Sequence, residues 1–251
     1  MNKLLEGKVA IVTGGAKGLG YGISRALASE GASVLISGRD GATAQAVAAE
    51  IERDFGSKAI GLAGDMGVKE DVLSMVQAAV DSFGGLDILV NNASLLSAGV
   101  LLEDKTDEML RRTLEIGVWG NWWAMQAAFP HMKKRGGGSV INFSSIDAQT
   151  GAWLHSDYNI NKLGIEGLTR SAAVEWGRFN IRVNAIAPGY IDTDMVAAVP
   201  APVLEKIVAK IHVGRLGMAE EIARGVAFLT SENGGFMTGS TMSINGGQHM
   251  Y

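Results

Sequence analysis

The 251-residue chain is 47% hydrophobic and 19% charged, which excludes a disordered tail and suits one large α/β domain spanning residues 1–251. It has no cysteine, which excludes disulfides, thiolate metal sites and a thiol nucleophile and is typical of a reducing cytoplasm. A formal net charge of −4 argues against a nucleic-acid partner, and no apolar run reaches the length of about 18 residues that predicts a membrane span. We therefore expect a cytoplasmic protein that binds neither nucleic acid nor membrane.

Short apolar runs rich in β-branched residues alternate along the chain with longer segments of helical period. Strands are expected at residues 8–13, 33–37, 59–62, 86–90, 139–143, 182–186 and 241–244, and helices at 19–30, 42–55, 69–83, 107–134, 157–178 and 219–230. Most of the strand segments are continuously apolar, as in parallel strands covered on both faces. The alternation predicts a single-domain, doubly wound Rossmann fold, with a parallel sheet of about seven strands and helices on both faces. The irregular stretch 189–214 is expected to form a substrate lid.

The turn after the first expected strand is rich in glycine and leads straight into a helix. Gly14, Gly18 and Gly20 would allow a tight turn and let the backbone approach a pyrophosphate, whose charge a helix N-terminus favours. The spacing is Gly-x-x-x-Gly-x-Gly rather than the commoner Gly-x-Gly-x-x-Gly. Taken alone, this stretch is also compatible with a plain turn.

Tyr158 and Lys162 stand four residues apart in an expected helix, so their side chains share one face. At about 5 Å and an effective dielectric near 20, the ammonium would favour the phenolate by roughly 3 kcal/mol, or about two pKa units. Such a tyrosine could exchange a proton near neutral pH. A surface pair without function is the alternative interpretation of these two residues in isolation.

Five motifs in register resemble the short-chain dehydrogenase/reductase family over essentially the whole chain. They are Thr13-Gly-x-x-x-Gly-x-Gly20, Asn91-Asn92-Ala93-Ser94, Ser145, Tyr158-x-x-x-Lys162 and Pro188-Gly189. The resemblance implies that Tyr158 protonates a carbonyl oxygen in reduction or removes a hydroxyl proton in oxidation. Lys162 would lower the pKa of that phenol and bond the nicotinamide ribose, and Ser145 would hold the carbonyl oxygen. No metal is expected.

Ser144 is the neighbouring alternative to Ser145, although a shift of one residue along a strand turns the side chain to the other face. His155, three residues before Tyr158, is interpreted as a polar contact near a helix start rather than as a general base.

The resemblance also implies a nicotinamide cofactor, and the charges after the second expected strand favour NADP over NAD. Gly38 stands where NAD-preferring members place an acid, and Arg39 follows it, with Lys17 on the same side. A small shift of the alignment with the family would place Asp40 at the position of the acid, so NAD remains an alternative. The remaining residues expected by resemblance to contact the cofactor are Gly14, Gly18, Leu19, Gly20, Asp65, Met66, Asn91, Ala93, Tyr158, Lys162, Pro188, Gly189, Ile191 and Thr193.

Three of these residues carry specific expectations. Asp65 matches the position that bonds the adenine amine, with a loop or N-cap aspartate as the alternative. Asn91 and Ala93 would flank the adenosine ribose. Thr193 would bond the carboxamide or a phosphate, with a simple helix cap as the alternative.

One residue of the family pattern is missing. The family usually has an asparagine in the long middle helix, and its backbone carbonyl holds a water that links the lysine to solvent. Here Gly117 occupies that position, and Asn121 is out of register. The carbonyl remains, but the bracing side chain is lost, and Gly117 and Gly120 each weaken a helix interior by roughly 1 kcal/mol. We expect an effect on the proton relay and the rate rather than on the reaction class.

The residues expected near the reaction centre are mostly apolar, and the expected lid has no arginine to clamp a carboxylate. By chain position they are Leu95, Leu96, Gln149, Trp153, Leu154, His155, Tyr190, Met195 and Val196. They predict a small-molecule substrate that is a neutral, fairly hydrophobic ketone or secondary alcohol. Trp119, Trp122 and Trp123 are interpreted as core or subunit interface, and the resemblance implies a homotetramer.

Three functions remain open at this point. The first is an NADP-dependent carbonyl reductase or alcohol dehydrogenase. The second is a 3-oxoacyl-thioester reductase acting on an acyl carrier protein or CoA, which the basic run Lys133-Lys134-Arg135 and the ending Ile244-Asn245-Gly246-Gly247 resemble. The third is a non-catalytic NADP-binding sensor, supported only by Gly117.

Overall fold

The computed structural model describes residues 3–193, 196 and 199–250. Seven parallel strands form one sheet in the order β3-β2-β1-β4-β5-β6-β7, so the predicted doubly wound fold is confirmed. Each strand begins and ends within two residues of its expected position. The strands are β1 (Val9–Thr13), β2 (Ser33–Gly38), β3 (Ala59–Ala63), β4 (Ile88–Asn91), β5 (Gly138–Phe143), β6 (Ile181–Pro188) and β7 (Thr241–Ile244).

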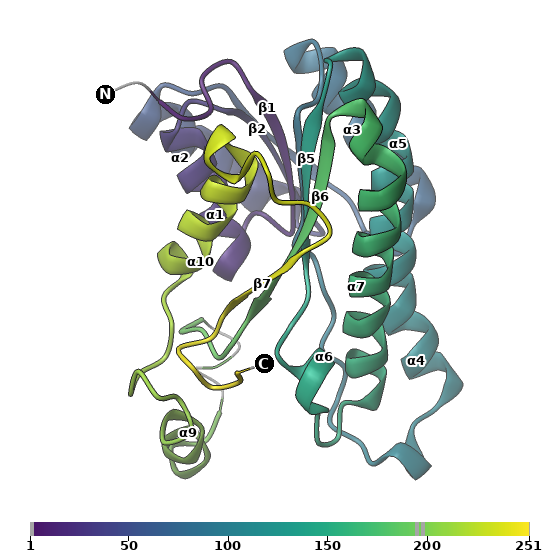
Figure 1. The fold of residues 1–251 in the computed structure, drawn as a ribbon, viewed down its shortest axis with the longest axis vertical. Helices are drawn as coiled ribbons and strands as arrows, with labels where there is room; N and C mark the ends of the chain where they lie inside the picture. The colour runs from purple at the N-terminus through teal and green to yellow at the C-terminus, as the bar shows by residue number, and fades with distance from the viewer. Residues whose placement is uncertain (1–2, 194–195, 197–198, 251) are drawn as a thin grey trace.

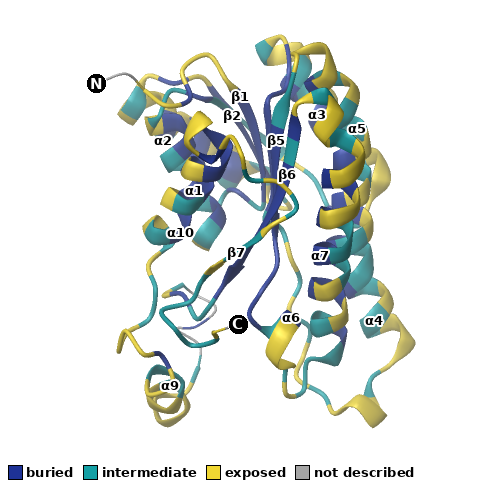
Figure 2. Cartoon of the chain, in the orientation of Figure 1, coloured by how far each residue is buried: buried dark blue, intermediate teal, exposed yellow. Residues whose placement is uncertain are grey.

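Two helical layers cover the sheet (Figure 1). One layer contains α1 (Gly18–Ser29), α2 (Gly41–Phe55) and α10 (Ala219–Thr230), and the other contains α3 (Lys69–Phe83), α5 (Gly120–Lys134) and α7 (Ser156–Trp176). The strands are therefore buried on both sides, as Figure 2 shows. In β1, Ala10, Ile11 and Val12 are fully buried. Burial of each valine or isoleucine side chain contributes about 1.5–3 kcal/mol.

The strand order reverses between β1 and β4, which both pair with their neighbours in parallel register. In open α/β sheets, ligands bind at the carboxyl ends of the strands beside such a reversal. The fold therefore directs attention to the segments that follow β1, β4, β5 and β6.

The middle helix predicted at 107–134 is interrupted. It consists of α4 (Asp107–Leu114), a π turn (Glu115–Trp119) and α5. The bounds of the predicted helix are confirmed, whereas the π turn was not predicted, since the closest contacts of its glycine and of the next one are tertiary. A Cβ on Gly117 would lie 1.9 Å from Oδ1 of Asn161, and a Cβ on Gly120 would lie 2.5 Å from the carbonyl oxygen of Met66. A π turn inserts an extra residue and often marks a functional site.

Among the residues that the structure describes, two short α-helices lie outside the predicted segments. One is α6 (Asp147–Thr150), and the other is α9 (Ala201–Val208), within the stretch 189–214. Pro202 lies in the first turn of α9, where the missing N–H of a proline removes no helical hydrogen bond. Met195, expected near the reaction centre, falls outside the described residues.

Across the described ranges, no helix combines the length and the apolar character needed to cross a bilayer.

Candidate active site

Two serines follow β5, and the structure separates their surroundings. The hydroxyl of Ser144 donates a 2.9 Å hydrogen bond to Glu166, and both side chains are buried. The hydroxyl of Ser145 instead accepts a 3.1 Å hydrogen bond from the backbone amide of Asp147 and lies within hydrogen-bonding reach of Tyr158. Because the Ser144 hydroxyl is bonded to Glu166 of α7, Ser145 is the serine available to a ligand at the end of the strand.

The first turns of α7 bring Tyr158 and Lys162 to the same place. The Nζ atom of Lys162 lies 5.2 Å from the ring centroid of Tyr158 and donates a 2.7 Å hydrogen bond to the carbonyl of Phe143. Only 2% of Lys162 is exposed, so its position is fixed by the surrounding protein. Ser145, Tyr158 and Lys162 thus converge at the carboxyl end of β5.

Burial dominates the electrostatics of this pair. Burial raises the pKa of Tyr158, the nearby Asp147 carboxylate raises it further, and the hydrogen bond from Ser145 lowers it in part. Burial lowers the pKa of Lys162 to about 7, against an opposing effect of Asp147. The tyrosine therefore shifts in the direction opposite to the one expected from the lysine alone, because a low-dielectric site favours the neutral form of both groups. At neutral pH, Tyr158 is a protonated donor.

Asp147 is a neighbour of this centre that the sequence did not reveal. Burial raises the pKa of the Asp147 carboxyl, while the charges of His155 and Lys162 and a hydrogen bond with Ser145 lower it. The same carboxylate raises the pKa of Tyr190. The available signal was an acid two residues beyond Ser145, but only the fold shows that it lies among the reacting groups.

The glycine turn after β1 is closely packed against the segment after β4. A Cβ on Gly20 would lie 2.0 Å from the carbonyl oxygen of Gly14, and a Cβ on Gly14 would lie 3.2 Å from Cα of Ala93. The amide of Asn92 donates hydrogen bonds to the carbonyls of Thr13, at 2.9 Å, and Gly14, at 3.2 Å. Backbone atoms approach Gly14 and Gly20 more closely than a side chain would allow, so glycine is required at both positions. The bare backbone of this turn suits the close approach of a pyrophosphate.

Asn91 differs from the expectation that its side chain flanks a ribose. It is 1% exposed, and its amide donates a 2.8 Å hydrogen bond to Asn142, the residue opposite it on β5. Met66 is also buried, at 6% exposed, within the hydrophobic core. Any contact of these two residues with a cofactor would come from the main chain. Leu19 likewise packs against the core cluster of α1 and α10.

Charged side chains lie after β1 and β2. Arg39 and Lys17 are exposed. The carboxylate of Asp40 caps α2 by accepting hydrogen bonds from the amide and hydroxyl of Thr43, at 3.2 and 2.5 Å. Because Asp40 is occupied in this way, Arg39 and Lys17 are the side chains available to a ligand at this end of the site.

Asp65 has a partner that the sequence did not reveal. It forms an ion pair with Arg112 of α4, and its Oδ1 accepts a 2.8 Å hydrogen bond from the amide of Gly67. Although burial raises the pKa of Asp65, the bonds from Gly67 and Arg112 lower it below the ordinary value. The carboxylate is therefore ionised and positioned to accept a further hydrogen bond.

The segment after β6 packs against the segments that follow β5 and β7. The carbonyl of Pro188 accepts a 3.3 Å hydrogen bond from the amide of Ile146, and a Cβ on Gly189 would lie 2.9 Å from Cα of Asn245. The buried Ile191 forms a bridge with Gly217.

Thr193 reaches the glycine turn itself. A Cβ on Gly18 would lie 3.8 Å from Cγ2 of Thr193. The glycine turn, the exposed cations Lys17 and Arg39 and this threonine together fit a dinucleotide. In the described parts of the chain, no three His, Asp or Glu side chains gather as a metal site would require.

The comparisons with known proteins agree with this geometry. Residues 14–249 match the family model described as enoyl-(acyl carrier protein) reductase. The chain is 37% identical to cis-4-hydroxycyclohexanecarboxylate dehydrogenase of Sinomonas cyclohexanicum, over 98% of each chain. It is 36% identical to the 3-oxoacyl-[acyl-carrier-protein] reductase FabG of Aquifex aeolicus, over 97% of this chain and 98% of that protein.

A solved structure from Sinorhizobium meliloti 1021, described as a presumed short-chain alcohol dehydrogenase, superposes with a TM-score of 0.92 at 33% identity. The superposition covers 99% of this chain and 98% of that one. The chain belongs to the short-chain dehydrogenase/reductase family. This oxidoreductase therefore uses a nicotinamide cofactor to interconvert a ketone and an alcohol.

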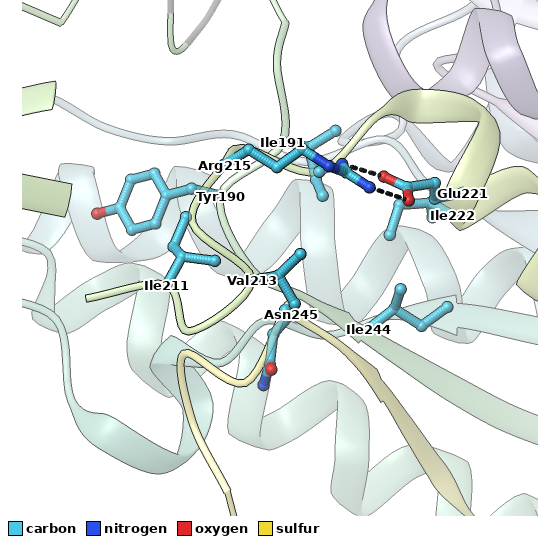
Figure 3. A pocket seen from close by; sticks show the side chains of 11 residues that line it. Tyr190, Ile191, Ile211, Val213, Arg215, Glu221, Ile222, Ile244 and Asn245 are labelled. Atoms are coloured by element: carbon cyan, nitrogen blue, oxygen red, sulfur yellow. Dashed lines mark hydrogen bonds and ion pairs between the residues drawn. The ribbon is translucent and has the colours of Figure 1, made fainter. Parts of the chain in front are cut away.

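A cavity of about 110 Å³ in this short-chain dehydrogenase/reductase lies under the segment that follows β6 (Figure 3). Tyr190 stands at one end, and Arg215 forms a two-point ion pair with Glu221, at 2.7 and 2.8 Å, at the other. None of Ser145, Tyr158 and Lys162 is among its described lining residues. Since both terminal nitrogens of the Arg215 guanidinium donate hydrogen bonds to Glu221, this arginine is not available to bind a substrate carboxylate.

The expected substrate-side residues differ in position. Trp153 is 80% exposed, and its expected place near the reaction centre stays a prediction. The carbonyl of Leu154 accepts a 3.0 Å hydrogen bond from the amide of Val100, which holds the loop before α7 against the segment after β4. Leu96 is 39% exposed, whereas Val196 is 8% exposed.

Proposed function

We propose that this enzyme is an NADP-dependent carbonyl reductase or alcohol dehydrogenase that acts on a neutral, hydrophobic ketone or secondary alcohol. The observation that carries the proposal is the convergence of Ser145, Tyr158 and the buried Lys162 at the end of β5. When bound, the cofactor supplies or accepts the hydride. The remaining steps belong to side chains of this chain.

In ketone reduction, the hydroxyl of Tyr158 donates its proton to the carbonyl oxygen, and Ser145 donates a hydrogen bond to the same oxygen. The raised pKa of Tyr158 keeps the phenol protonated before the transfer. After the transfer, the phenolate is stabilised by the adjacent Lys162, which is held in place by the carbonyl of Phe143. In alcohol oxidation the proton moves in the opposite direction.

Two features support NADP as the cofactor. Arg39 and Lys17 are exposed beside the glycine turn, where a planar guanidinium suits a 2′-phosphate. Asp40, the residue that would favour NAD, is engaged in capping α2. These contacts support the preference inferred from Gly38 and Arg39.

One feature supports a neutral reacting group, and another separates the basic run from the catalytic residues. The Asp147 carboxylate beside Tyr158 would repel a substrate carboxylate. The basic run at the end of α5 lies at the amino ends of the strands, because Arg135 pairs with Asp87 immediately before β4 begins. Ser145 instead follows the carboxyl end of β5.

The outer face of the α5 and α7 layer supports the proposal of a homotetramer. Trp119, Trp122, Ile160 and Leu163 are between 46% and 55% exposed on the π turn and these two helices. Such apolar side chains are typical of a face covered in an assembly. We further propose that residues 189–214 act as a lid and that the enzyme works in the cytoplasm.

The proposed function is tested by a screen of cyclic and aryl ketones and acetoacetyl thioesters with NADPH and NADH, run in both directions. We expect NADPH-dependent reduction of neutral ketones. Turnover restricted to thioesters would favour the 3-oxoacyl-thioester reductase instead. Binding of NADPH without turnover of any ketone would contradict catalysis and favour the sensor.

A further inference from the structure

Asn161 occupies the space that a side chain at residue 117 would fill. It lies on α7 directly before Lys162 and is fully buried. A Cβ built on Gly117 would lie 1.9 Å from Oδ1 and 2.3 Å from Nδ2 of Asn161, closer than two such atoms can approach. The amide of Asn161 therefore packs directly on the π turn, and Gly117 is the residue that allows this contact.

The amide of Asn161 has polar atoms that the surrounding protein leaves unsatisfied. Within the part of the chain that the structure describes, neither its Oδ1 nor its Nδ2 has a hydrogen-bond partner. The same holds for both amide atoms of Asn121, which lies one helical turn after Gly117. An unsatisfied buried polar group costs about 1–3 kcal/mol, and ordered water is the usual partner that removes this cost.

The position of this amide connects it to the proton chemistry. Lys162 follows Asn161 on α7, and its ammonium has three donors, one of which bonds the carbonyl of Phe143 at 2.7 Å. The phenolate left on Tyr158 after each reduction must regain a proton from solvent. Consecutive side chains of a helix point about 100° apart, so the Asn161 amide faces the π turn while the Lys162 ammonium faces Phe143. An amide can both donate and accept, so a buried water bonded to it would extend the route from Lys162 towards the π turn.

We propose that Asn161 is a positioning residue for the proton relay: from α7 it replaces the side chain that Gly117 lacks, and its amide holds buried water at the π turn, one residue along the helix from Lys162. This proposal rests on the proposed function, since it assigns Asn161 a part in reprotonating Tyr158. The packing of Asn161 on Gly117 is independent of that function and can be tested in the cofactor-free protein.

The packing is tested by the unfolding temperatures of single and double variants. Gly117→Ala should lower Tm by about 3–8 °C because the new methyl overlaps Asn161. Asn161→Ser in the same chain should recover at least about half of that loss. Gly167→Ala is the matched control, since a Cβ at this glycine of α7 meets nothing within 4 Å, and it should leave Tm unchanged or raise it. Additive effects of the two substitutions would overturn the proposed packing.

The relay is tested by the kinetics of ketone reduction. Asn161→Ser should lower kcat about tenfold, shift its pH profile and leave the KM for NADPH within about twofold. Gly117→Asn combined with Asn161→Ser moves the amide to the other helix and should restore most of kcat and the pH profile. An Asn161→Ser variant with wild-type kcat and pH profile would overturn the relay role, even if the packing effect is found.

A wild-type protein that reduces no ketone would contradict the proposed function and with it the relay role. The unfolding measurements would still decide whether Asn161 packs in place of a side chain at residue 117. The two failures are therefore distinguishable.

Discussion

At the scale of single residues, burial rather than local charge pairing governs the reacting groups. Lys162 is almost completely buried, and its pKa is lowered to about 7. An unfolded chain would titrate this lysine near 10.4, so between about pH 7 and 10.4 the unfolded state binds more protons than the folded one. The free energy of unfolding therefore rises with pH across this window as far as Lys162 contributes. Below about pH 7, Lys162 is charged in the folded state as well, and the full free-energy cost of burying its ammonium remains.

Lys162→Met removes that buried charge. We expect this variant to raise Tm by about 2–6 °C at pH 7, because an uncompensated buried ion is replaced by an apolar side chain. The difference from the wild type should shrink as the pH approaches 10. Thermal unfolding measured between pH 6 and 10 checks this, and an equal pH dependence in both proteins would contradict it.

Asp147→Asn tests the second electrostatic neighbour of Tyr158. The Asp147 carboxylate raises the pKa of the phenol, so its removal should lower that pKa. Because ketone reduction uses the protonated phenol, the alkaline limb of kcat should move to lower pH in the variant, as should the rise of alcohol oxidation. The pH profiles of both directions provide the measurement. A shift towards higher pH would contradict this placement of Asp147.

At the scale of elements, a buried network ties the loop after β4 to the start of the catalytic helix. Nζ of Lys105 lies 2.7 Å from Oδ1 of Asp157 and donates a 2.9 Å hydrogen bond to Ser97. Oδ2 of Asp157 accepts hydrogen bonds from Ser97, at 2.6 Å, and from Thr113 of α4, at 2.9 Å. Asp157 directly precedes Tyr158, so this network fixes the first turn of α7.

Lys105→Met should therefore cost more than a surface substitution. It leaves the Asp157 carboxylate buried without its counter-ion, and we expect a loss of about 3–5 kcal/mol in unfolding free energy. Lys105→Met combined with Asp157→Asn should recover much of this loss, because the unpaired charge is removed. Denaturant unfolding of the two variants is the measurement, and equal losses would show that the charge is not the cause.

At the scale of the whole molecule, the sheet could be predicted because its strands are continuously apolar and buried on both faces, as in β1 and β4. The grouping of Ser145, Tyr158 and Lys162 followed from motif order. The π turn could not be predicted, because the contact of Gly117 with Asn161 joins residues 44 positions apart that only the fold brings together. Asp147 and Arg112 were missed for the same reason.

Cofactor preference also belongs to this scale, because it depends on the charges that several elements bring to one edge. Arg39→Asp should lower the ratio of kcat/KM for NADPH over NADH by about 10- to 100-fold, since charge-assisted bonds to a 2′-phosphate are replaced by repulsion. Arg53→Asp, a change of the same charge at an exposed position near the end of α2, is the control and should leave the ratio unchanged. An unchanged ratio in Arg39→Asp would assign the phosphate to another group.

The central claim is that Tyr158 transfers the proton. Its most direct test is Tyr158→Phe. The matched control is Tyr21→Phe, because the hydroxyl of Tyr21 on α1 donates its hydrogen bond to Glu50 of α2, in the helical layer on the other face of the sheet. Ketone reduction by Tyr158→Phe should fall by a factor of about 10²–10⁴, with NADPH affinity within about threefold of the wild type. The control should keep its activity. Turnover by Tyr158→Phe within tenfold of the wild type would contradict the account.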